Sequence, residues 1–394
     1  MKIAIDLRQL LEPHAKQRGV GVYTSELIDA LALHGPEHRW VEFSNGWSQP
    51  VIPSPAPFVI PSDPGLDPGE SRDLINLNSP RIPIITKHLP NKLLNLSLLT
   101  TNRPHLDKLI GGADVWIAPN LNFTSVSPRC KLIQVVHDLS FLVNPSWYSL
   151  KSRMWHRAIR VQKVLNRADA VVAISKATAE DLAQHFPEIQ NKVHVIYPGV
   201  PTTPVVTPED QQAVRKKYHL PVRFFLYVGA LEPRKNIATL LDAFAHFTHT
   251  TAYPHELILA GPSMSLRGGV SPTKQSNRIH YLGPVSAETK HTLLSLAEAL
   301  VFPSLYEGFG FPPLEAMSHG TPVIASWSTS LPEVVGDAGL LVSPYKPHEL
   351  AHAMRMIADH ADVRKDLSRR ALERSRQFTW EKTAREFLNL CTSQ

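Results

Sequence analysis

The stretch from residue 302 to residue 317 constrains the fold more than any other part of this chain. The apolar run Ala299–Phe302 leads into it and predicts a buried strand. Gly308 and Gly310 then permit a tight loop in which the backbone can come close to a ligand. Pro312 and Pro313 suit the first positions of a helix, because the missing N–H loses no hydrogen bond there. The stretch therefore predicts a strand, a loop and the start of a helix, as in an α/β sheet.

The predicted helix start lies between two carboxylates. Free backbone N–H groups at a helix N-terminus favour an anion, and phosphate is common there in α/β sheets. Glu307 and Glu315 flank the loop, and ionised carboxylates accept hydrogen bonds from the hydroxyl groups of a ligand. A diphosphate between two carboxylates that bind hydroxyl groups describes a nucleotide-sugar. The alternative interpretation is an ordinary strand, loop and helix with a glutamate in the first turn.

The same stretch resembles the signature of the family-4 retaining glycosyltransferases. Their motif is two glutamates separated by seven residues with Gly-Phe-Gly between them, matched here by Glu307, Gly308, Phe309, Gly310 and Glu315. The resemblance implies the GT-B fold, an α/β fold in which two Rossmann-like doubly wound domains face each other across a cleft. It also implies that Glu307 touches the transferred sugar and that Glu315 holds the ribose of the nucleotide.

The chain is long enough for two domains, since its 394 residues suit two units of about 190 residues each. Three prolines and a glycine between residues 197 and 204 predict the boundary. We expect an N-terminal, acceptor-side Rossmann-like domain at 1–198, to which a C-terminal helix at 376–394 crosses back. We expect the nucleotide-sugar-binding Rossmann-like domain at 199–375. The two cysteines predict neither a disulfide framework nor a zinc cluster.

Two glycines near the N-terminus follow the first predicted strand. Gly19 and Gly21 come before a helix predicted over Glu26–Leu33, so they are placed at a strand-to-helix junction. A dinucleotide fingerprint would need a third glycine where Thr24 stands, which argues against an NAD-dependent oxidoreductase. A plain turn is the alternative interpretation. The family resemblance implies that this loop faces the donor phosphate and the reacting sugar, although Val22 stands where arginine is frequent in the family.

The strand predicted from residue 131 to residue 136 also ends in polar residues. His137 and Asp138 come directly after it, at the carboxyl end where parallel sheets place ligand chemistry. A core histidine beside a helix-capping aspartate is the alternative interpretation. The resemblance favours function, because family members carry His-Asp at this strand end near the donor sugar.

The second half of the chain restarts the α/β pattern with a strand at 224–228. Arg234 and Lys235 come soon after its end, which suits neutralisation of a diphosphate, although a bare pair also fits an ordinary surface. In the family the corresponding Arg-Lys pair contacts the donor diphosphate. Val285 follows another strand, at 279–282, where the resemblance places the nucleotide base.

No Asp-x-Asp pair occurs in the sequence, which disfavours a metal-bridged diphosphate. The positive charge would come from Arg234, Lys235 and the helix N-terminus at Pro312, which would stabilise the leaving nucleoside diphosphate. The resulting hypothesis is a metal-independent hexosyltransferase that retains configuration by front-face attack, without a cofactor. Its predicted catalytic residues are Glu307 and His137, and its predicted substrate-binding residues are Gly19, Gly21, Arg234, Lys235, Val285, Gly308, Phe309, Gly310, Phe311 and Glu315.

The donor and the acceptor are predicted from the family alone. Members with a Gly-x-Gly-x-Tyr loop near the N-terminus often use GDP-mannose, so a mannosyltransferase of polysaccharide biosynthesis is favoured, acting on a glycan or lipid-linked acceptor. UDP-sugar donors remain an alternative. A nucleotide-sugar 2-epimerase shares the architecture but does not usually carry the double-glutamate stretch. A sensor without activity would need lost site residues, and the main ones are present, Val22 aside.

A basic segment lies between residues 150 and 167, where we expect one helix. Residues 151–167 contain six lysines and arginines and no acid, with basic residues on one predicted face and apolar residues such as Met154, Trp155 and Ile159 on the other. The net charge of +6 also favours anionic partners. Such a helix can lie on an anionic membrane or bind a phosphorylated acceptor, and a solvated face with its apolar side on the core is the alternative. Nucleic acid is not an expected partner.

The remaining features concern location and the longest irregular segment. Residues 1–6 begin directly as a strand, and no apolar run approaches the roughly 20 residues that span a bilayer. A cytoplasmic protein, with a peripheral place at the inner membrane face, is therefore expected. The proline-rich segment from Pro50 to Pro104 is predicted as a long loop on the acceptor side.

Overall fold

The computed structural model describes residues 1–11, 19–45, 84–87, 89–249, 253–263 and 277–393. Contacts divide the chain into two compact units, one of Met1–Ile133 with Trp380–Gln394 and the other of Gln134–Thr379. Two parallel sheets, each with Rossmann-like strand order, form the framework of the fold. Within the described ranges, every helix is too short or too polar to span a lipid bilayer.

The first sheet has the strand order β3-β2-β1-β4-β5-β6-β7. The chain leaves β1 towards β2 and β3 on one side and returns to β4 on the other, which makes β1 and β4 the switch point of a doubly wound sheet. Fully buried runs such as that of β4 fit strands that are covered on both faces. The strands are β1 Lys2–Asp6, β2 Arg39–Asn45, β3 Ile84–Lys87, β4 Val115–Ala118, β5 Lys131–Val136, β6 Ala170–Ala173 and β7 Val193–Val195.

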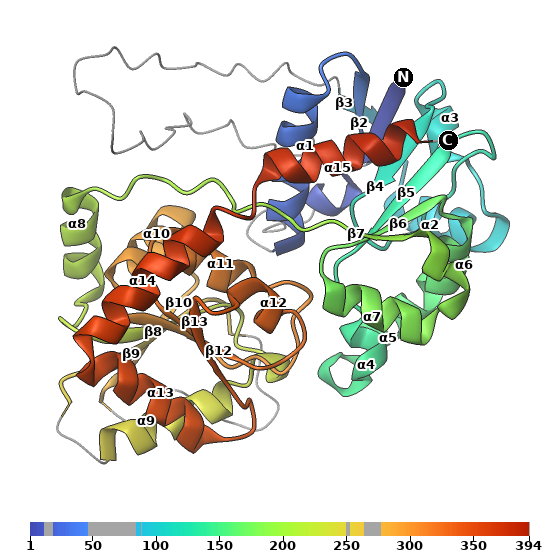
Figure 1. Ribbon diagram of the computed structural model, residues 1–394. Helices are drawn as coiled ribbons and strands as arrows, with labels where there is room; N and C mark the ends of the chain where they lie inside the picture. Colours follow the sequence, from blue (N-terminus) through green and yellow to red (C-terminus); the bar gives the residue numbers. More distant parts are fainter. Residues whose placement is uncertain (12–18, 46–83, 88, 250–252, 264–276, 394) are drawn as a thin grey trace, which may run out of the picture. The chain divides into compact units, whose positions relative to one another are not determined.

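The second sheet repeats this topology with the order β10-β9-β8-β11-β12-β13. Its switch point lies between β8 and β11, which pair in parallel. The core of the second unit packs the buried strands against apolar faces of α9, α11 and α13, and α9 lies beside α13 (Figure 1). The strands are β8 Phe224–Val228, β9 Glu256–Ala260, β10 Ile279–Gly283, β11 Ala299–Phe302, β12 Val323–Ser326 and β13 Gly339–Val342.

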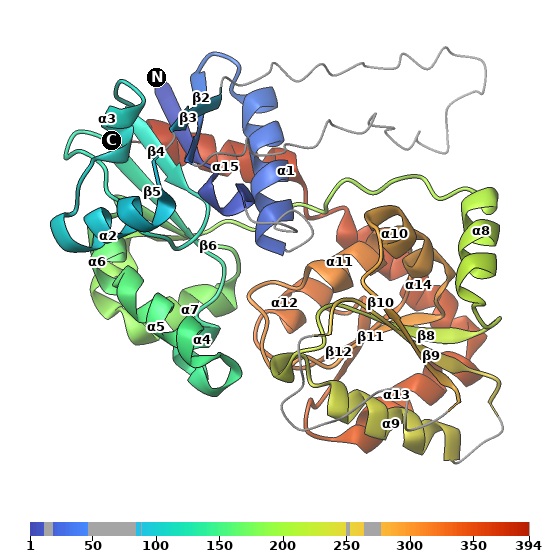
Figure 2. The ribbon, with the colours of Figure 1, turned by 180° about the vertical axis from the view of Figure 1, so that it is seen from behind.

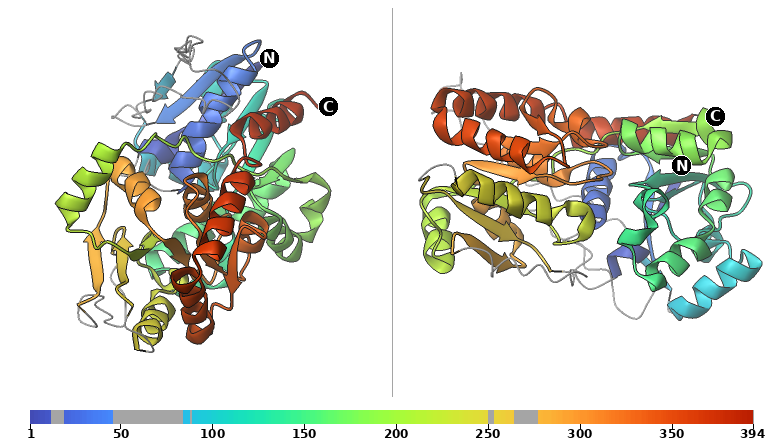
Figure 3. Two further views of the ribbon diagram at one scale, coloured as in Figure 1. Left: turned by 60° about the vertical axis from the view of Figure 1, so that its left-hand side comes forward. Right: turned by 90° about the horizontal axis from the view of Figure 1, so that it is seen from below.

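Helices connect the strands in the usual α/β manner. The last helix, α15, lies against α1 within the first unit (Figure 2), where the rings of Tyr23 and Trp380 meet at 5.5 Å. In the second unit, α8 lies beside α10 (Figure 3). The α-helices are α1 Gly19–His34, α2 Asn91–Thr101, α3 Leu106–Leu109, α4 Ser140–Val143, α5 Leu150–Ile159, α6 Val161–Arg167, α7 Lys176–His185, α8 Pro208–Tyr218, α9 Ile237–His249, α10 Ala287–Leu296, α11 Phe311–Ser318, α12 Leu331–Val335, α13 Pro347–Asp359, α14 Ala361–Ser375 and α15 Trp380–Thr392. Short 3-10 helices cover Arg8–Leu11, Pro145–Trp147, Pro187–Lys192 and Pro233–Lys235.

Three local predictions need correction. Helix α1 begins at Gly19, seven residues before the predicted start, so Gly19 and Gly21 belong to its first turn. The segment predicted as a loop from Pro50 to Pro104 contains β3 and α2 at its end, and residues 50–83 lie outside the described part. The basic segment forms two helices, because Arg160 adopts left-handed backbone angles (φ 55°, ψ 57°) between α5 and α6.

The domain limits stay a prediction. The order of the first sheet groups residues 2–195, which fits a boundary at residues 197–204. The contact division instead assigns residues from Gln134 onward to the second unit. It does assign the end of the chain, from Trp380, to the first unit, as the predicted crossing helix requires.

Candidate active site

The candidate site lies at the switch point of the second sheet. The 3-10 helix Pro233–Lys235 follows β8, and Glu307 follows β11, the neighbouring strand. The carboxyl ends of parallel strands meet at one edge of a sheet, and the crevice at a switch point is where such sheets bind ligands. The Arg234 carbonyl accepts a hydrogen bond from the Leu305 N–H at 2.8 Å, which joins the two loops.

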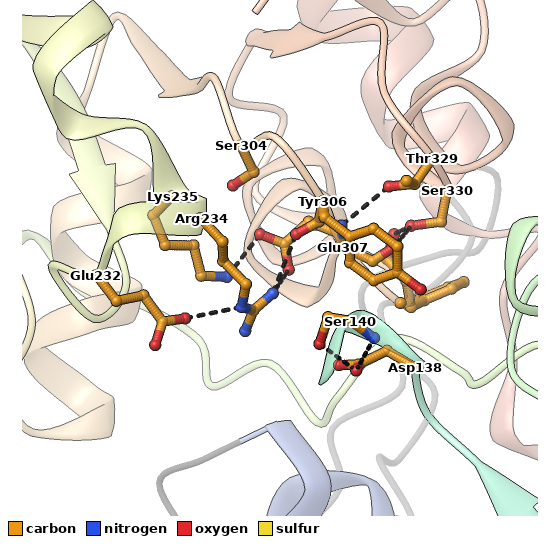
Figure 4. Close-up of polar contacts among 12 residues, drawn as sticks. Asp138, Ser140, Glu232, Arg234, Lys235, Ser304, Tyr306, Glu307, Thr329 and Ser330 are labelled. Carbon is orange, nitrogen blue, oxygen red and sulfur yellow. Dashed lines mark hydrogen bonds and ion pairs between the residues drawn. The ribbon is translucent and has the colours of Figure 1, made fainter. Parts of the chain in front are cut away.

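An ion-pair cluster occupies this edge. The Lys235 Nζ donates to Glu307 Oε1 at 2.6 Å, and the Arg234 Nη1 donates to Glu307 Oε2 at 3.2 Å. On its other side the Arg234 Nε contacts Glu232 Oε1 at 3.0 Å, as Figure 4 shows. Lys235 is 8% exposed and Glu307 is 7% exposed, so these charges are largely removed from water. Two cations therefore converge on one buried carboxylate.

The protonation states follow from this geometry. Burial acts to raise the pKa of the Glu307 carboxyl, but the charges of Lys235 and Arg234 overcome it and lower that pKa below its ordinary value. Burial lowers the pKa of Lys235, although Glu307 opposes the shift. Burial also acts to lower the pKa of Arg234, while Glu307 and Glu232 raise it, so the guanidinium stays charged. Glu307 is thus an ionised carboxylate at neutral pH.

The backbone around Glu307 is fixed by hydroxyl groups that follow β12. The Glu307 N–H donates to Thr329 Oγ1 at 2.9 Å. The Ser330 hydroxyl lies within hydrogen-bonding distance of both the Glu307 and the Phe309 carbonyls, at 2.9 and 2.7 Å. Thr329 takes a positive φ of 44°, an uncommon angle for a β-branched residue. These contacts hold the motif loop in place (Figure 4).

Gly308 lies against the strand end that carries His137. A Cβ at Gly308 would lie 2.0 Å from the His137 carbonyl oxygen, so no side chain fits there. The Thr178 hydroxyl lies within hydrogen-bonding distance of both the His137 and the Gly308 carbonyls, at 3.2 and 3.3 Å. The structure therefore brings the predicted residues His137 and Gly308 together through their backbones.

The start of α11 matches the predicted helix N-terminus. Gly310 has a φ of +117° and precedes the helix, whose first turn contains Pro312 and Pro313. Phe309 is buried in an aromatic cluster with Tyr197 and Phe378 and also meets Phe311 at 5.4 Å. The side chain of Phe309 therefore packs, and its predicted contact with substrate would have to come from its backbone.

Glu315 lies within α11 and is also buried. Its Oε1 accepts from the Lys290 Nζ of α10 at 2.7 Å, a partner that sequence reasoning missed. Beside this pair, His291 Nδ1 and His319 Nε2 are 2.9 Å apart, and burial lowers their pKa values to about 3 and about 4. Val285, the predicted base contact, is partly buried against the core after β10.

A group of polar side chains lies near Arg234, and of these the sequence analysis had indicated only Asp138. The Asp138 Oδ1 accepts from the Ser140 hydroxyl, and that hydroxyl lies 2.5 Å from the Tyr148 hydroxyl. The charge of Asp138 contributes to the raised pKa of Arg234. The Tyr306 hydroxyl donates to Asp181 at 2.5 Å. The signal for Asp138 was its place beside His137 at a strand end, whereas nothing local in the sequence indicates Asp181.

Two of the predicted site residues belong to the first unit and not to the second. Gly19 and Gly21 are in α1 of the first unit, so their role towards this site stays a prediction. Among the described residues, no group of three or more His, Cys, Asp or Glu side chains could hold a metal ion. The independence of the reaction from metal stays a prediction as well.

Family models match both halves of the chain. A family model described as "Glycosyl transferases group 1" matches residues 210–374, and one described as "Glycosyltransferase Family 4" matches residues 17–203. O-antigen chain mannosyltransferase B of Escherichia coli is 32% identical over 274 residues, which are 66% of this chain and 69% of that protein. The serotype-specific mannosyltransferase WbdA of Escherichia coli is 31% identical over 264 residues, 64% of this chain but 32% of that protein. The match thus spans about a third of WbdA.

Solved structures show the same fold. HepE of Anabaena, crystallised with UDP and glucose, has a TM-score of 0.70 at 19% identity, with 100% of both chains covered. WaaG, a glycosyltransferase involved in lipopolysaccharide biosynthesis, has a TM-score of 0.67 at 15% identity, again with full coverage. The two family models and the similarity to a mannosyltransferase show that the chain is a glycosyltransferase. The chain belongs to glycosyltransferase family 4 and has the GT-B fold, which confirms both predictions.

Proposed function

We propose that this glycosyltransferase moves a hexose, mannose from GDP-mannose, onto a glycan or lipid-linked acceptor with retention of configuration. The observation that carries the proposal is the pairing of Lys235 and Arg234 with Glu307 at the β8–β11 switch point. The names of the relatives support mannose and a polysaccharide, because two of them are mannosyltransferases and one of these acts on an O-antigen chain.

The cations suit a diphosphate leaving group. Lys235 has three N–H donors, and one of them contacts Glu307. Arg234 uses Nε and Nη1 towards Glu232, Tyr306 and Glu307, which leaves Nη2 without a hydrogen bond to any described residue. With the N–H groups at the start of α11, these donors would stabilise the negative charge that develops as the nucleoside diphosphate leaves. The step would then need no metal.

The two carboxylates would accept hydrogen bonds from hydroxyl groups of the donor. Glu307 would contact the transferred sugar, and Glu315, held by Lys290, would contact the ribose of the nucleotide. His137 would lie near the donor sugar, since its carbonyl meets Gly308. Attack of the acceptor hydroxyl would occur on the same face as departure of the diphosphate, with the leaving phosphate assisting deprotonation.

A UDP-sugar donor is the main alternative, because HepE has been solved with UDP-glucose. A nucleotide-sugar 2-epimerase is a weaker one. It would release free sugar without any acceptor, so the products of a donor-only incubation separate it from a transferase. Both alternatives use the same cations and differ in the base or in the fate of the sugar.

Donor binding gives the first test. In a thermal-shift panel, GDP-mannose is expected to raise the Tm by more than GDP, and by more than UDP-glucose or UDP-N-acetylglucosamine. In Glu307→Gln, GDP is expected to raise the Tm as before, because Arg234 and Lys235 still hold the phosphates. The additional rise in Tm that GDP-mannose gives over GDP is expected to be lost. Glu373→Gln, at an exposed site on α14, serves as the control. A larger shift with a UDP-sugar would refute the donor, and no shift with any nucleotide would refute the function.

The basic segment differs from its simplest interpretation, because part of its apolar side is exposed and not packed on the core. On α5, Leu150 is 74% exposed and Met154 is 73% exposed, at the helical spacing i, i+4. The exposed cations Lys151, Arg153 and Arg157 lie on the same helix, and residues 139–168 contain no acid. The stacking of His156 on Phe141 at 4.3 Å joins α5 to α4, which adds the exposed Leu142 and Val143.

We infer that this surface, residues 142–163, contacts an anionic membrane. Exposed apolar side chains among cations are the pattern of an interfacial helix, whereas a purely solvated face would not expose leucine and methionine together. A membrane contact would bring the enzyme to a lipid-linked acceptor. The two helices and the bend at Arg160 replace the single predicted helix, but the basic character of the segment is retained.

Vesicle binding tests this surface. The double variant Arg153→Glu/Arg157→Glu is expected to sediment with vesicles of phosphatidylcholine and phosphatidylglycerol at least tenfold less than the unchanged protein, since each cation near such a surface contributes about 1 kcal/mol. Lys216→Glu/Lys217→Glu, on the exposed side of α8, gives the same change of charge elsewhere. Leu150→Ser/Met154→Ser should weaken binding as well, with Val222→Ser as its match. Equal sedimentation of the α5 and α8 variants would refute the contact.

A further inference from the structure

A hollow of about 680 Å³ lies at the β12–β13 end of the second sheet, to one side of the ion-pair cluster. Its volume falls within the range of ordinary ligand sites. Two short loops form it, one after β12 and one after β13. The lining residues are Trp327, Ser328, Thr329, Leu341, Val342, Ser343, Pro344, Tyr345 and Glu349.

Two aromatic side chains of the hollow are open to solvent. Trp327 is 68% exposed and Tyr345 is 77% exposed, although burial of such rings is strongly favourable. The Trp327 N–H donates to the Val342 carbonyl at 2.7 Å, so the backbone that carries the ring is fixed to β13. Exposed aromatic rings on a fixed backbone offer apolar faces to a ligand at little entropic cost.

The rest of the lining is rich in hydroxyl and carboxylate groups. Ser328, Thr329 and Ser343 supply hydroxyls. Glu349 accepts from Lys346 at 2.8 Å and from the Ser343 N–H at 3.0 Å, which lowers its pKa. An ionised carboxylate has further lone pairs and accepts from hydroxyl groups, but it repels anions. The hollow therefore suits a neutral ligand with both apolar faces and hydroxyl groups.

Hydrogen bonds connect both loops to the ion-pair cluster or to residues next to it. Thr329 lines the hollow and accepts the hydrogen bond from the Glu307 N–H. On the other side, the Asn236 amide donates to the Pro344 carbonyl at 2.7 Å and to the Pro303 carbonyl at 3.1 Å. Asn236 directly follows Lys235 in the sequence. Trp327 is two residues from Thr329, so the Cα atoms of Trp327 and Thr329 are at most about 7 Å apart. The hollow is thus a rigid neighbour of the donor site.

We propose that the hollow is a carbohydrate subsite, in which Trp327 and Tyr345 stack on a pyranose unit of the acceptor glycan away from its growing end. Pyranoses combine apolar C–H faces with hydroxyl groups, which matches rings beside hydroxyls and a carboxylate. The inference rests on the proposed glycan acceptor. A nucleotide base is the less suitable occupant, because the base is expected near Val285 after β10, at the opposite end of the strand order from β12 and β13.

Acceptor length provides the readout. Transfer would be measured to mannose oligosaccharides from the monosaccharide to the hexasaccharide, with the donor that the thermal-shift panel selects. Trp327→Ala/Tyr345→Ala is expected to lower the ratio of kcat/KM for the hexasaccharide to that for the monosaccharide about tenfold, because stacking on two rings is lost. Trp327→Phe/Tyr345→Phe keeps both rings and should restore most of this ratio. Val205→Ala removes an exposed apolar side chain elsewhere and should leave the ratio unchanged.

Direct binding separates this inference from the function on which it rests. In isothermal titration without donor, the hexasaccharide is expected to bind the unchanged protein about tenfold more tightly than the alanine double variant. An unchanged length ratio together with equal binding would overturn the subsite while leaving the transferase assignment intact. Lack of transfer from any nucleotide-sugar would instead refute the proposed function, and the titration would still decide whether the rings bind sugar.

Discussion

Replacing Gly308 with alanine is expected to lower the transfer rate about 100-fold and to destabilise the second unit by several kcal/mol. A Cβ at this position would lie 2.0 Å from the His137 carbonyl oxygen and 3.0 Å from the Asp138 Cβ. The oxygen belongs to backbone at the end of a buried strand, so it cannot rotate away as a flexible side chain would. Either the motif loop or the end of β5 has to shift, and a displacement of about 1 Å near reacting atoms can cost about 100-fold in rate.

The proper control for Gly308→Ala is a glycine with open space around it. At Gly112 an added Cβ meets nothing within 4 Å, although the φ of +88° is unfavourable for alanine. Gly112→Ala should therefore cost only about 1–2 kcal/mol from backbone strain and leave transfer intact. Chemical denaturation and the transfer rate measure both effects. Transfer by Gly308→Ala at the unchanged rate would show that the approach of His137 to Gly308 is not needed.

The role of Gly308 shows what local sequence could and could not predict. Glycine and proline spacing correctly predicted a strand, a close loop and the start of α11. The prediction gave both glycines the same reason, namely backbone freedom in a tight loop. In the structure Gly310 does need a positive φ, whereas Gly308 is required because another strand end approaches it. That approach joins residues about 170 positions apart, which no local pattern encodes.

The same limit applies to the partners of the two glutamates. Residue types and strand ends identified Arg234, Lys235, Glu307 and Glu315, but not which of them form pairs. Lys235 meets Glu307 across 72 positions of sequence, and Lys290 meets Glu315 across 25. The hydrogen bond that the Glu307 N–H donates to Thr329 depends on the order of β11 and β12 in the sheet. Tertiary pairing therefore completes a site of which sequence indicates the components.

Helical periodicity predicted only part of the structure of the basic segment. It placed charged and apolar residues on opposite faces of one helix, and it left open whether the apolar face packs on the core or contacts an anionic membrane. Of the apolar residues used for that face, Ile159 is buried and Met154 is exposed. The left-handed turn at Arg160 ends α5, so the stripe does not continue along one straight helix. Periodicity describes a face of a helix, and it does not say what covers that face.

Lys235→Met is expected to lower turnover by about 10²–10³-fold and to destabilise the protein by about 3–5 kcal/mol at neutral pH. Methionine keeps most of the volume but removes the cation at 2.6 Å from Glu307, which leaves a buried carboxylate with Arg234 alone. It also removes one of the donors proposed to hold the leaving diphosphate. Arg369→Met, which removes exposed ion pairs on α14, should change stability little and serves as the control.

The pH dependence distinguishes loss of this ion pair from a simple packing defect. The folded-state pKa of Glu307 is lowered, so its contribution to stability is present above the ordinary value of 4.5 and is lost as the pH falls through the lowered value. Without Lys235 that lowering weakens, and Glu307 takes up a proton at a higher pH. The difference in unfolding free energy between the unchanged protein and Lys235→Met should therefore be largest near neutral pH and narrow in acid. Adding Glu307→Gln to Lys235→Met should recover part of the lost stability, because the unpaired charge is gone. A difference that stays constant with pH, with no recovery in the double variant, would show that Lys235 acts through its packing and not through its charge.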